Sequence, residues 1–174
     1  MRNGKAKEMM KIPAQCRSEC REQECGQSWI MEVEGDQLLP GVQTLWEQGY
    51  FLEDVTCSDF TEGFQLIYHF AHWDTPGRVS LKCFVDHDNP RIPSIATIFK
   101  GANWHERECA DFFGISFEGH PNPLPLLLPP EANFHPLVKE PSKRQSVHKV
   151  IPFCQMVACD ESVAEESDRN TTHE

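Results

Sequence analysis

The chain has 174 residues, enough for one domain of ordinary size with terminal extensions. Sixteen basic and 27 acidic residues give a formal net charge of −11, which argues against nucleic acid or an anionic membrane surface as the main partner. No stretch approaches the roughly 18 apolar residues of a spanning helix, and the N-terminal MRNGKAKEMMKIPAQ lacks the apolar centre of a secretory signal. We therefore expect a soluble, cytoplasmic protein that reaches a membrane only through a partner.

The cysteines are numerous for a chain of this kind, and without an export signal a disulfide framework is disfavoured. They are Cys16, Cys20, Cys25, Cys57, Cys83, Cys109, Cys154 and Cys159. The first three lie in residues 1–27, a polar stretch that we expect to be a poorly ordered tail. The spacings do not match zinc ribbons or ferredoxins. An iron–sulfur or zinc site built from the first three and one distant ligand stays an alternative, and the middle three are expected to be small buried residues.

In chain order, the first predicted strand is SWIMEVEG at residues 28–35, where apolar and polar residues alternate. A helix follows from Asp36, its predicted N-cap, to about Gln48, and Gly49 ends it. Three segments rich in aromatic and β-branched residues then read as strands at 51–60, 63–73 and 78–86. The turn residues between these three strands favour an antiparallel meander.

The order β-α-β-β-β-α predicts an α+β fold for residues 28–119. We expect a two-layer sandwich, in which a mostly antiparallel sheet carries two helices on one face. The side chains predicted to form its core are Ile30, Val33, Leu45, Trp46, Leu66, Tyr68, Phe70, Leu81, Phe84, Ile95 and Ile98.

The second helix lies in residues 103–121, NWHERECADFFGISFEGHP. This stretch combines signals for a helix start and a helix end with a cluster of charged residues and a Gly-His-Pro turn. Asn103 is a predicted N-cap, and Glu106 stands three residues later, where a carboxylate reaches back to the cap amide. Gly114 is predicted to end the helix in the left-handed conformation. The helix should therefore span about residues 104–113.

Two pairs of side chains on this helix lie four residues apart. Arg107 and Asp111 can form an ion pair. His105 and Cys109 could place two metal ligands on one face, but two ligands do not complete a coordination shell. We therefore predict no metal site here, and a purely structural role for these charges stays open.

After Gly119 the composition changes. Residues 120–153 hold eight of the thirteen prolines, each of which removes a backbone donor and prevents regular structure. The same stretch is rich in leucine, at Leu124, Leu126, Leu127 and Leu128. A flexible linker is one interpretation, but leucines favour an extended docking arm that lies over another subunit. Residues 154–174 are acidic and poor in apolar residues, so we expect a disordered tail.

The common enzymatic signatures are missing from the sequence. It contains no G-x-G-x-x-G, P-loop, G-x-S-x-G or H-E-x-x-H pattern, and its eight histidines are scattered. We therefore predict no catalytic residues.

Residues 102–121 closely resemble the signature of the 30 kDa subunit family of respiratory complex I. That family also includes counterpart subunits of energy-converting, membrane-bound nickel–iron hydrogenases. The resemblance spans about residues 28–131, with LIYHFA and the stretch 88–98 also similar. The motif residues that carry it are Glu106, Arg107, Glu108, Asp111, Phe112, Phe113, Gly114, Phe117, Glu118, Gly119, His120 and Pro121.

The resemblance implies a non-catalytic, cofactor-free subunit at the cytoplasmic side of the cell membrane, in an NADH:quinone oxidoreductase or an energy-converting hydrogenase. The implied partners are the large catalytic subunit, of the 49 kDa or hydrogenase large-subunit type, and neighbouring subunits that carry iron–sulfur clusters. Quinone or nickel–iron chemistry would belong to those partners. The implied interface residues are Glu106, Arg107, Glu108, Asp111, Phe112, Phe113, Gly114, Gly119, His120, Pro121, Leu124, Leu126, Leu127 and Leu128.

One feature departs from the family pattern. Members usually carry an arginine shortly after the His-Pro, as in HPDLRR, whereas this chain reads HPNPLPLLL, with Leu124 and Pro125 in that region. The loss of a cationic contact modestly favours a hydrogenase-like parent complex. The alternative function is a small metal or iron–sulfur electron-transfer protein that uses Cys16, Cys20 and Cys25.

Overall fold

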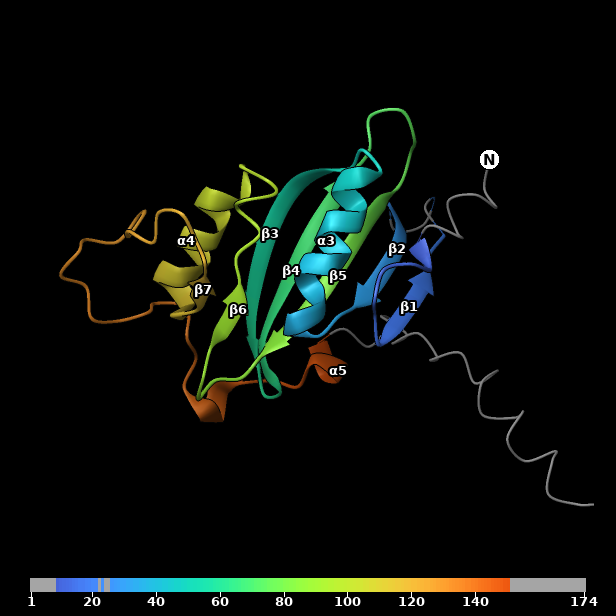
Figure 1. The fold of residues 1–174 in the computed structure, drawn as a ribbon. Coiled ribbons are helices and arrows are strands. Elements are labelled where there is room, and N and C mark those ends of the chain that lie inside the picture. The colour runs from blue at the N-terminus through green and yellow to red at the C-terminus, as the bar shows by residue number, and fades with distance from the viewer. Residues whose placement is uncertain (1–8, 22, 24–25, 151–174) are drawn as a thin grey trace, which may run out of the picture.

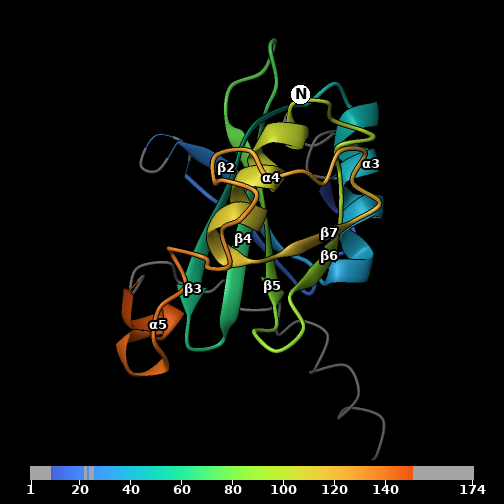
Figure 2. The same ribbon diagram turned by 90° about the vertical axis from the view of Figure 1, so that its left-hand side faces the viewer.

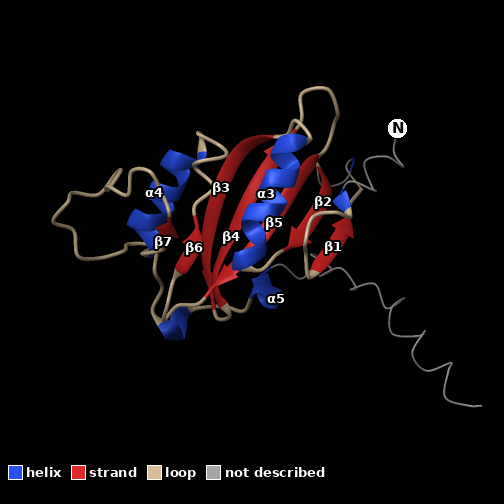
Figure 3. Cartoon of the chain, viewed as in Figure 1, coloured by secondary structure: helices blue, strands red, loops and turns tan. Residues whose placement is uncertain are grey.

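The computed structural model describes residues 9–21, 23 and 26–150. They form an α+β fold, in which a five-stranded mixed sheet packs against two helices (Figures 1 and 3). The strands are β1 (Cys16–Glu19), β2 (Gln27–Glu32), β3 (Phe51–Phe60), β4 (Gly63–Ala71), β5 (Arg78–Val85), β6 (Arg91–Pro93) and β7 (Ser116–Glu118). The helices are α3 (Leu38–Glu47), α4 (Ala102–Phe113) and the short α5 (Val147–Val150), with 3₁₀ turns at Gly35–Gln37 and Pro141–Lys143.

The predicted meander is confirmed, because β3 pairs antiparallel with β4 and β4 with β5. The sheet order is β1-β2-β5-β4-β3, so β2 lies beside β5 and runs parallel to it. This one parallel pair makes the sheet mixed. Strands β6 and β7 form a separate two-stranded parallel sheet.

The N-terminal segment differs from the expected tail. Strand β1 pairs antiparallel with β2 at the outer edge of the sheet. Met9 and Ile12 are fully buried in the core, and the side chain of Ile12 packs close to Gly41 on α3. Strand β1 has the sequence CRSE, in which apolar and polar residues do not alternate. The sequence pattern therefore could not predict this strand.

Helix α3 lies across one face of the sheet, and α4 packs against the edge strand β3 (Figures 1 and 2). The inward stripe of α3 is Leu38, Val42 and Leu45, at helical spacing. Trp46, expected in the core, is next to this stripe and is 53% exposed, because one residue turns the side chain by about 100°. Within the described ranges, no helix has the length and apolar character needed to cross a bilayer.

Most other predicted core residues are indeed buried. These are Val33, Leu45, Leu66, Tyr68, Phe70, Leu81 and Ile95. Ile30, Phe84 and Ile98 are only half-buried.

The predicted helix ends are confirmed, but the predicted caps are wrong. Gly49 and Gly114 have φ of 81° and 74°, the left-handed region that favours glycine. Helix α4 begins at Ala102, and its first turn has no side-chain cap. Instead the amides of Ala102 and Asn103 donate to carbonyls of the preceding turn, at Phe99 and Lys100. Backbone carbonyl groups thus accept hydrogen bonds from two of the amides that a helix start leaves without partners in the helix.

Helix α3 likewise has no side-chain cap. It starts at Leu38 after Gln37, and Asp36 lies in the 3₁₀ turn before it.

Replacement of Gly114 by alanine should destabilise the chain. The new Cβ would combine a positive φ with a 2.8 Å approach to the ring of His135, at a cost of about 1–3 kcal/mol. The matched control is Gly101→Ala, where φ is −61° and nothing lies within 4 Å. Chemical denaturation of both variants measures the difference, and equal stabilities would contradict the left-handed end of α4.

Candidate functional site

The segment that follows β7 is the strap, defined here as residues 120–147. It is rich in proline and lacks long regular structure, apart from the 3₁₀ turn at Pro141–Lys143. Proline has no amide hydrogen, and an irregular segment cannot pair its own backbone groups in a ladder. The strap therefore needs partners on the body of the domain, and the structure supplies them at several points.

Asp111 on α4 binds the leucine-rich part of the strap. One carboxylate oxygen, Oδ2, accepts hydrogen bonds from the amides of Leu126, Leu127 and Leu128, with N–O distances of 2.9, 2.8 and 3.0 Å. Three amides converging on one anion make a strong, charge-assisted contact. The loop at 126–128 is thereby folded around the helix.

Arg107 binds the residues just before this loop. Its Nε and Nη2 donate to the carbonyl oxygens of Leu124 and Pro125, at 2.6 and 2.7 Å. The expected ion pair between Arg107 and Asp111 is replaced by contacts of both side chains with one loop. The helix thus binds the strap through a donor and an acceptor one turn apart.

The C-terminal end of α4 is also covered by the strap. The Nδ1 of His135 donates to the carbonyl oxygen of Asp111 at 2.8 Å, and the amide of Leu137 donates to that of Phe112 at 3.1 Å. Carbonyl groups in the last turn of a helix have no partner within the helix. The strap completes the helix end, and the ring of His135 rests against Gly114.

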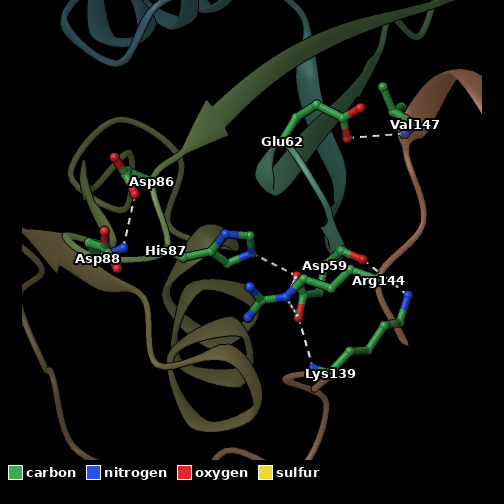
Figure 4. Close-up of polar contacts among 8 residues, drawn as sticks. All are labelled: Asp59, Glu62, Asp86, His87, Asp88, Lys139, Arg144 and Val147. Atoms are coloured by element: carbon green, nitrogen blue, oxygen red, sulfur yellow. Dashed lines mark hydrogen bonds and ion pairs between the residues drawn. The ribbon is translucent and has the colours of Figure 1, made fainter. Parts of the chain in front are cut away.

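Asp59, at the end of β3, anchors the later part of the strap. Figure 4 shows the side chains of His87 and Arg144 and the backbone amide of Lys139 converging on this carboxylate, which is 1% exposed. The Nε2 of His87 lies 2.8 Å from Oδ1, the Lys139 amide donates to Oδ2 at 2.8 Å, and the Nε of Arg144 is 3.1 Å from Oδ1. Lys139 also donates through Nζ to the carbonyl oxygen of Asp59 at 3.0 Å.

Glu62, in the turn after β3, binds the last residues of the strap. Its carboxylate accepts hydrogen bonds from the hydroxyl of Ser146 and, at 3.1 Å, from the amide of Val147 (Figure 4 shows the second). The strap is therefore attached from its leucine-rich loop to its end.

The two buried aspartates are held ionised by the strap. Burial alone would raise the pKa of Asp111, but hydrogen bonds from the three strap amides and the charge of Arg107 lower it below 3.8. Burial likewise opposes ionisation of Asp59, and its bonds to Lys139 and His87 lower its pKa below 3.8. Both contacts are therefore formed by carboxylates at neutral pH.

Glu106 does not have the predicted role at the helix start. Its side chain is completely buried, and it accepts hydrogen bonds from the Ser94 hydroxyl at 2.5 Å and the Ile95 amide at 2.7 Å. Ser94 in turn accepts from the Ala96 amide at 3.1 Å. Burial raises the pKa of Glu106 to about 7, although these two donors lower it in part. Glu106 fixes the loop that precedes α4 and cannot touch a partner directly.

His120, the first residue of the strap, covers Glu106. Its Nε2 lies 3.6 Å from Oε2 of Glu106 and 3.2 Å from the carbonyl oxygen of Asn103. Its Nδ1 accepts the amide hydrogen of Asn122 at 3.0 Å. An accepting Nδ1 places the imidazole proton on Nε2, which then donates to Asn103.

A cavity of about 290 Å³ lies between α4, β7 and the strap. The polar groups in its wall include Arg107 and Asp111 of α4 and His135 of the strap, whose bonds between α4 and the strap are described above. Three apolar side chains of the strap, Leu124, Leu127 and Phe134, are 64%, 59% and 60% exposed. Leu124 and Phe134 also line the cavity. The charged groups of Arg107 and Asp111 are thus bound to the strap, while large apolar side chains of the strap are exposed.

The fourteen residues expected at an interface fall into separate groups. Glu106, Asp111 and Phe113 are buried in this chain, and Gly114 and Gly119 have positive φ. The half-buried members are Arg107, Glu108, Phe112, His120, Leu126 and Leu128. Those that stand exposed are Pro121, Leu124 and Leu127. The structure therefore gathers the motif and the leucines around one strap, and only a few of them face solvent.

The sequence did not predict several of the residues that bind the strap to the domain. Asp59 and Glu62 bind partners about 80 residues later, and no local motif marks such a contact. His135 could have been suspected from its place in a proline-rich stretch without regular structure, but nothing in the sequence names its target.

In the described part of the chain, no group of three or more His, Cys, Asp or Glu side chains could hold a metal ion. His105 lies 3.1 Å from Asp54, and burial raises the pKa of Cys109 to about 12. Cys16 and Cys20 are half-buried.

The other members of the two cysteine groups, Cys25, Cys154 and Cys159, lie outside the described residues, as does the predicted acidic tail at 154–174.

Comparison with known proteins places these features in a family. A family model described as the respiratory-chain NADH dehydrogenase 30 Kd subunit matches residues 31–147. The NADH-quinone oxidoreductase C subunit of Roseiflexus sp. (strain RS-1) is 40% identical over 93 residues, 52% of this chain and 53% of that protein. The NADH-quinone oxidoreductase C/D subunit of Methylococcus capsulatus is 40% identical over 77 residues, 44% of this chain and 13% of that protein. The chain thus spans about half the length of the Roseiflexus relative.

Two solved structures share the fold at 23% identity. One is the trypsin-resistant fragment (1-134) of Nqo5, with a TM-score of 0.57 over 70% of this chain and 99% of the fragment. The other belongs to the membrane-bound sulfane sulfur reductase, an archaeal respiratory membrane complex, with a TM-score of 0.67 over 87% of this chain and 89% of that one.

Replacement of Asp111 by alanine should release the loop at 126–128. Loss of a charged acceptor shared by three amides costs about 1.5–3 kcal/mol, and the amides of Leu126, Leu127 and Leu128 should exchange hydrogen faster. Hydrogen exchange resolved by residue measures this, with the exposed Asp36→Ala as control. Unchanged protection of the three amides would contradict the role of Asp111.

The Asp59 anchor should make the strap sensitive to acid. A carboxyl whose folded pKa lies below its ordinary value of 3.8 stabilises the fold above that pH, and the stabilisation is lost as the pH falls through the folded pKa. Asp59→Asn should therefore be less stable than wild type at pH 7 and closer to it at pH 3. Urea unfolding at both pH values tests this, with the exposed Asp88→Asn as control; an equal deficit at both would refute it.

Proposed function

Because the chain belongs to the family of the respiratory-chain NADH dehydrogenase 30 kDa subunit, we propose that it is a non-catalytic subunit in the peripheral arm of a complex I-related, membrane-bound oxidoreductase. In this role it docks on the large catalytic subunit and stabilises it while electrons pass through neighbouring iron–sulfur subunits. The chain itself carries no cofactor and meets the membrane, at its cytoplasmic side, only through the complex.

The strap carries this proposal. Its backbone is bound to the domain by buried carboxylates, while the side chains of Leu124, Leu127 and Phe134 are each about 60% exposed. An isolated protein gains nothing from ordering a loop in order to expose large apolar side chains. Clusters of this kind on ordered segments are typical of protein–protein contacts. Preorganisation also reduces the entropy lost when a partner binds.

The proposed partner is a large subunit of the D, or 49 kDa, type. One relative is named a C/D subunit, and the part similar to this chain is 13% of its length. A C-type sequence within a longer chain of that name supports a direct contact between C-type and D-type proteins. The same docking role applies in an energy-converting hydrogenase, where the counterpart is the hydrogenase large subunit.

The proposed interface is narrower than the motif suggests. The sequence predicts a docking arm at residues 120–153. Within the strap, residues 120–147, we propose that its exposed apolar side chains contact the partner. Arg107 and Asp111 act by shaping the arm, since their charged groups are bound to its backbone. The apolar character of this surface agrees with HPNPLPLLL in place of an arginine-bearing sequence.

Leu127→Glu combined with Phe134→Glu should prevent assembly without unfolding the chain. Both side chains are exposed, so the stability of the isolated protein should change by no more than about 0.5 kcal/mol. A charge at a central apolar contact costs about 2 kcal/mol or more of binding, roughly thirtyfold in affinity. The measurement is recovery of the large subunit with the tagged chain from detergent-solubilised membranes.

The control is Trp46→Glu, another apolar side chain that is 53% exposed but lies on α3. It should leave recovery of the large subunit near the wild-type level. Full recovery with the double variant would reject docking through the strap.

A further inference from the structure

Glu106 is a buried acid, and no lysine or arginine side chain in the described part of the chain forms an ion pair with it. Its side chain is 0% exposed, and the two groups that donate to it are the neutral hydroxyl of Ser94 and the amide of Ile95. The adjacent guanidinium of Arg107 is bound to two carbonyl oxygens of the strap. An isolated buried carboxylate is costly, and such groups usually bind a proton instead.

The titratable groups packed around Glu106 do not supply a positive charge. Tyr68 on β4 and Cys109 on α4 are both within its electrostatic influence, and burial raises the pKa of the Tyr68 phenol and the Cys109 thiol, so both stay neutral.

The third facing group is His120. Its Nδ1 accepts the Asn122 amide hydrogen, so the ring hydrogen lies on Nε2. This Nε2 points toward Glu106, with 3.6 Å between Nε2 and Oε2.

We propose that Glu106 holds a proton in the folded chain, and that this proton keeps the first turn of the strap closed. When the carboxyl ionises, the buried charge favours states in which water reaches it. Glu106 and His120 both line the cavity beneath the strap, and water can reach the carboxyl from this cavity once His120 moves. Displacing His120 breaks its bonds to Asn103 and Asn122, and the turn at residues 120–122 opens.

The pH range follows from linkage. The pKa of Glu106 is about 7 in the folded chain and 4.5 in its ordinary state, so the closed form binds more protons than the open form between these values. The closed form of the turn at residues 120–122 is most strongly favoured below pH 4.5. Its stability relative to the open form decreases as the pH rises toward 7. Opening should increase by up to about tenfold per pH unit across this range and then level off. Any effect on docking rests on the proposed function, whereas the proton is a property of the isolated chain.

The test uses the full-length chain alone. The side-chain carboxyl carbon of Glu106 is followed by NMR from pH 4 to 9, together with hydrogen exchange at the Asn122 amide, corrected for intrinsic pH dependence. We expect Glu106 to titrate near 7 and the opening of the turn to follow the same curve. Glu106→Gln mimics the protonated form and should remove this dependence. Glu118→Gln, a side chain 58% exposed on β7, should keep it.

Either of two results overturns the inference. One is titration of Glu106 at or below its ordinary pKa; the other is a Glu106→Gln protein whose turn opens with the wild-type pH dependence. If the Gln variant does not fold, the wild-type carboxyl titration decides alone. Because the partner subunit is absent, a failure of docking through Leu127 and Phe134 leaves this test unaffected, and the converse also holds.

Discussion

The structure depends on a few buried carboxylates that bind the backbone of a segment unable to bind itself. Proline-rich chain cannot form a ladder, and its amides and carbonyls need partners elsewhere. Asp111 accepts three successive amides, and Asp59 accepts one amide and the Arg144 guanidinium. Because these contacts are charge-assisted and largely shielded from water, they order a strap that hydrophobic burial alone would leave loose. The geometry of the cavity and of the exposed leucines follows from them.

This arrangement separates two tasks along one stretch of sequence. The acidic motif of α4 faces inward, where Glu106 fixes the preceding loop and Asp111 fixes the following one. The exposed apolar side chains, such as Leu124 and Leu127, belong to the strap. The charged residues of the motif therefore hold the docking surface in shape, and the proposed contacts with the partner are made by apolar side chains. That division accounts for a family signature in which charges, glycines and a His-Pro turn occur together.

Features set by local interactions could be predicted from the sequence. The glycines at 49 and 114 end their helices because a positive φ excludes most other residues, and the meander follows from strand alternation and short turns. Features set by distant partners could not. Glu106 lies three residues after the predicted N-cap, a spacing at which its carboxylate could bond to the cap amide. In the structure it instead accepts hydrogen bonds from Ser94 and Ile95, which precede the helix. The contact between Asp59 and Lys139 joins residues 80 positions apart, and no sequence pattern in β3 predicts it.

The central claim is that the strap is already shaped in the free chain and is then covered by the large subunit. Electron cryo-microscopy of the complex purified through this chain tests it most directly. The account predicts that Leu124, Leu127 and Phe134 are buried against the large subunit, with the three amide bonds to Asp111 unchanged. A complex in which these side chains face solvent, or in which the strap has left Asp111, would contradict it.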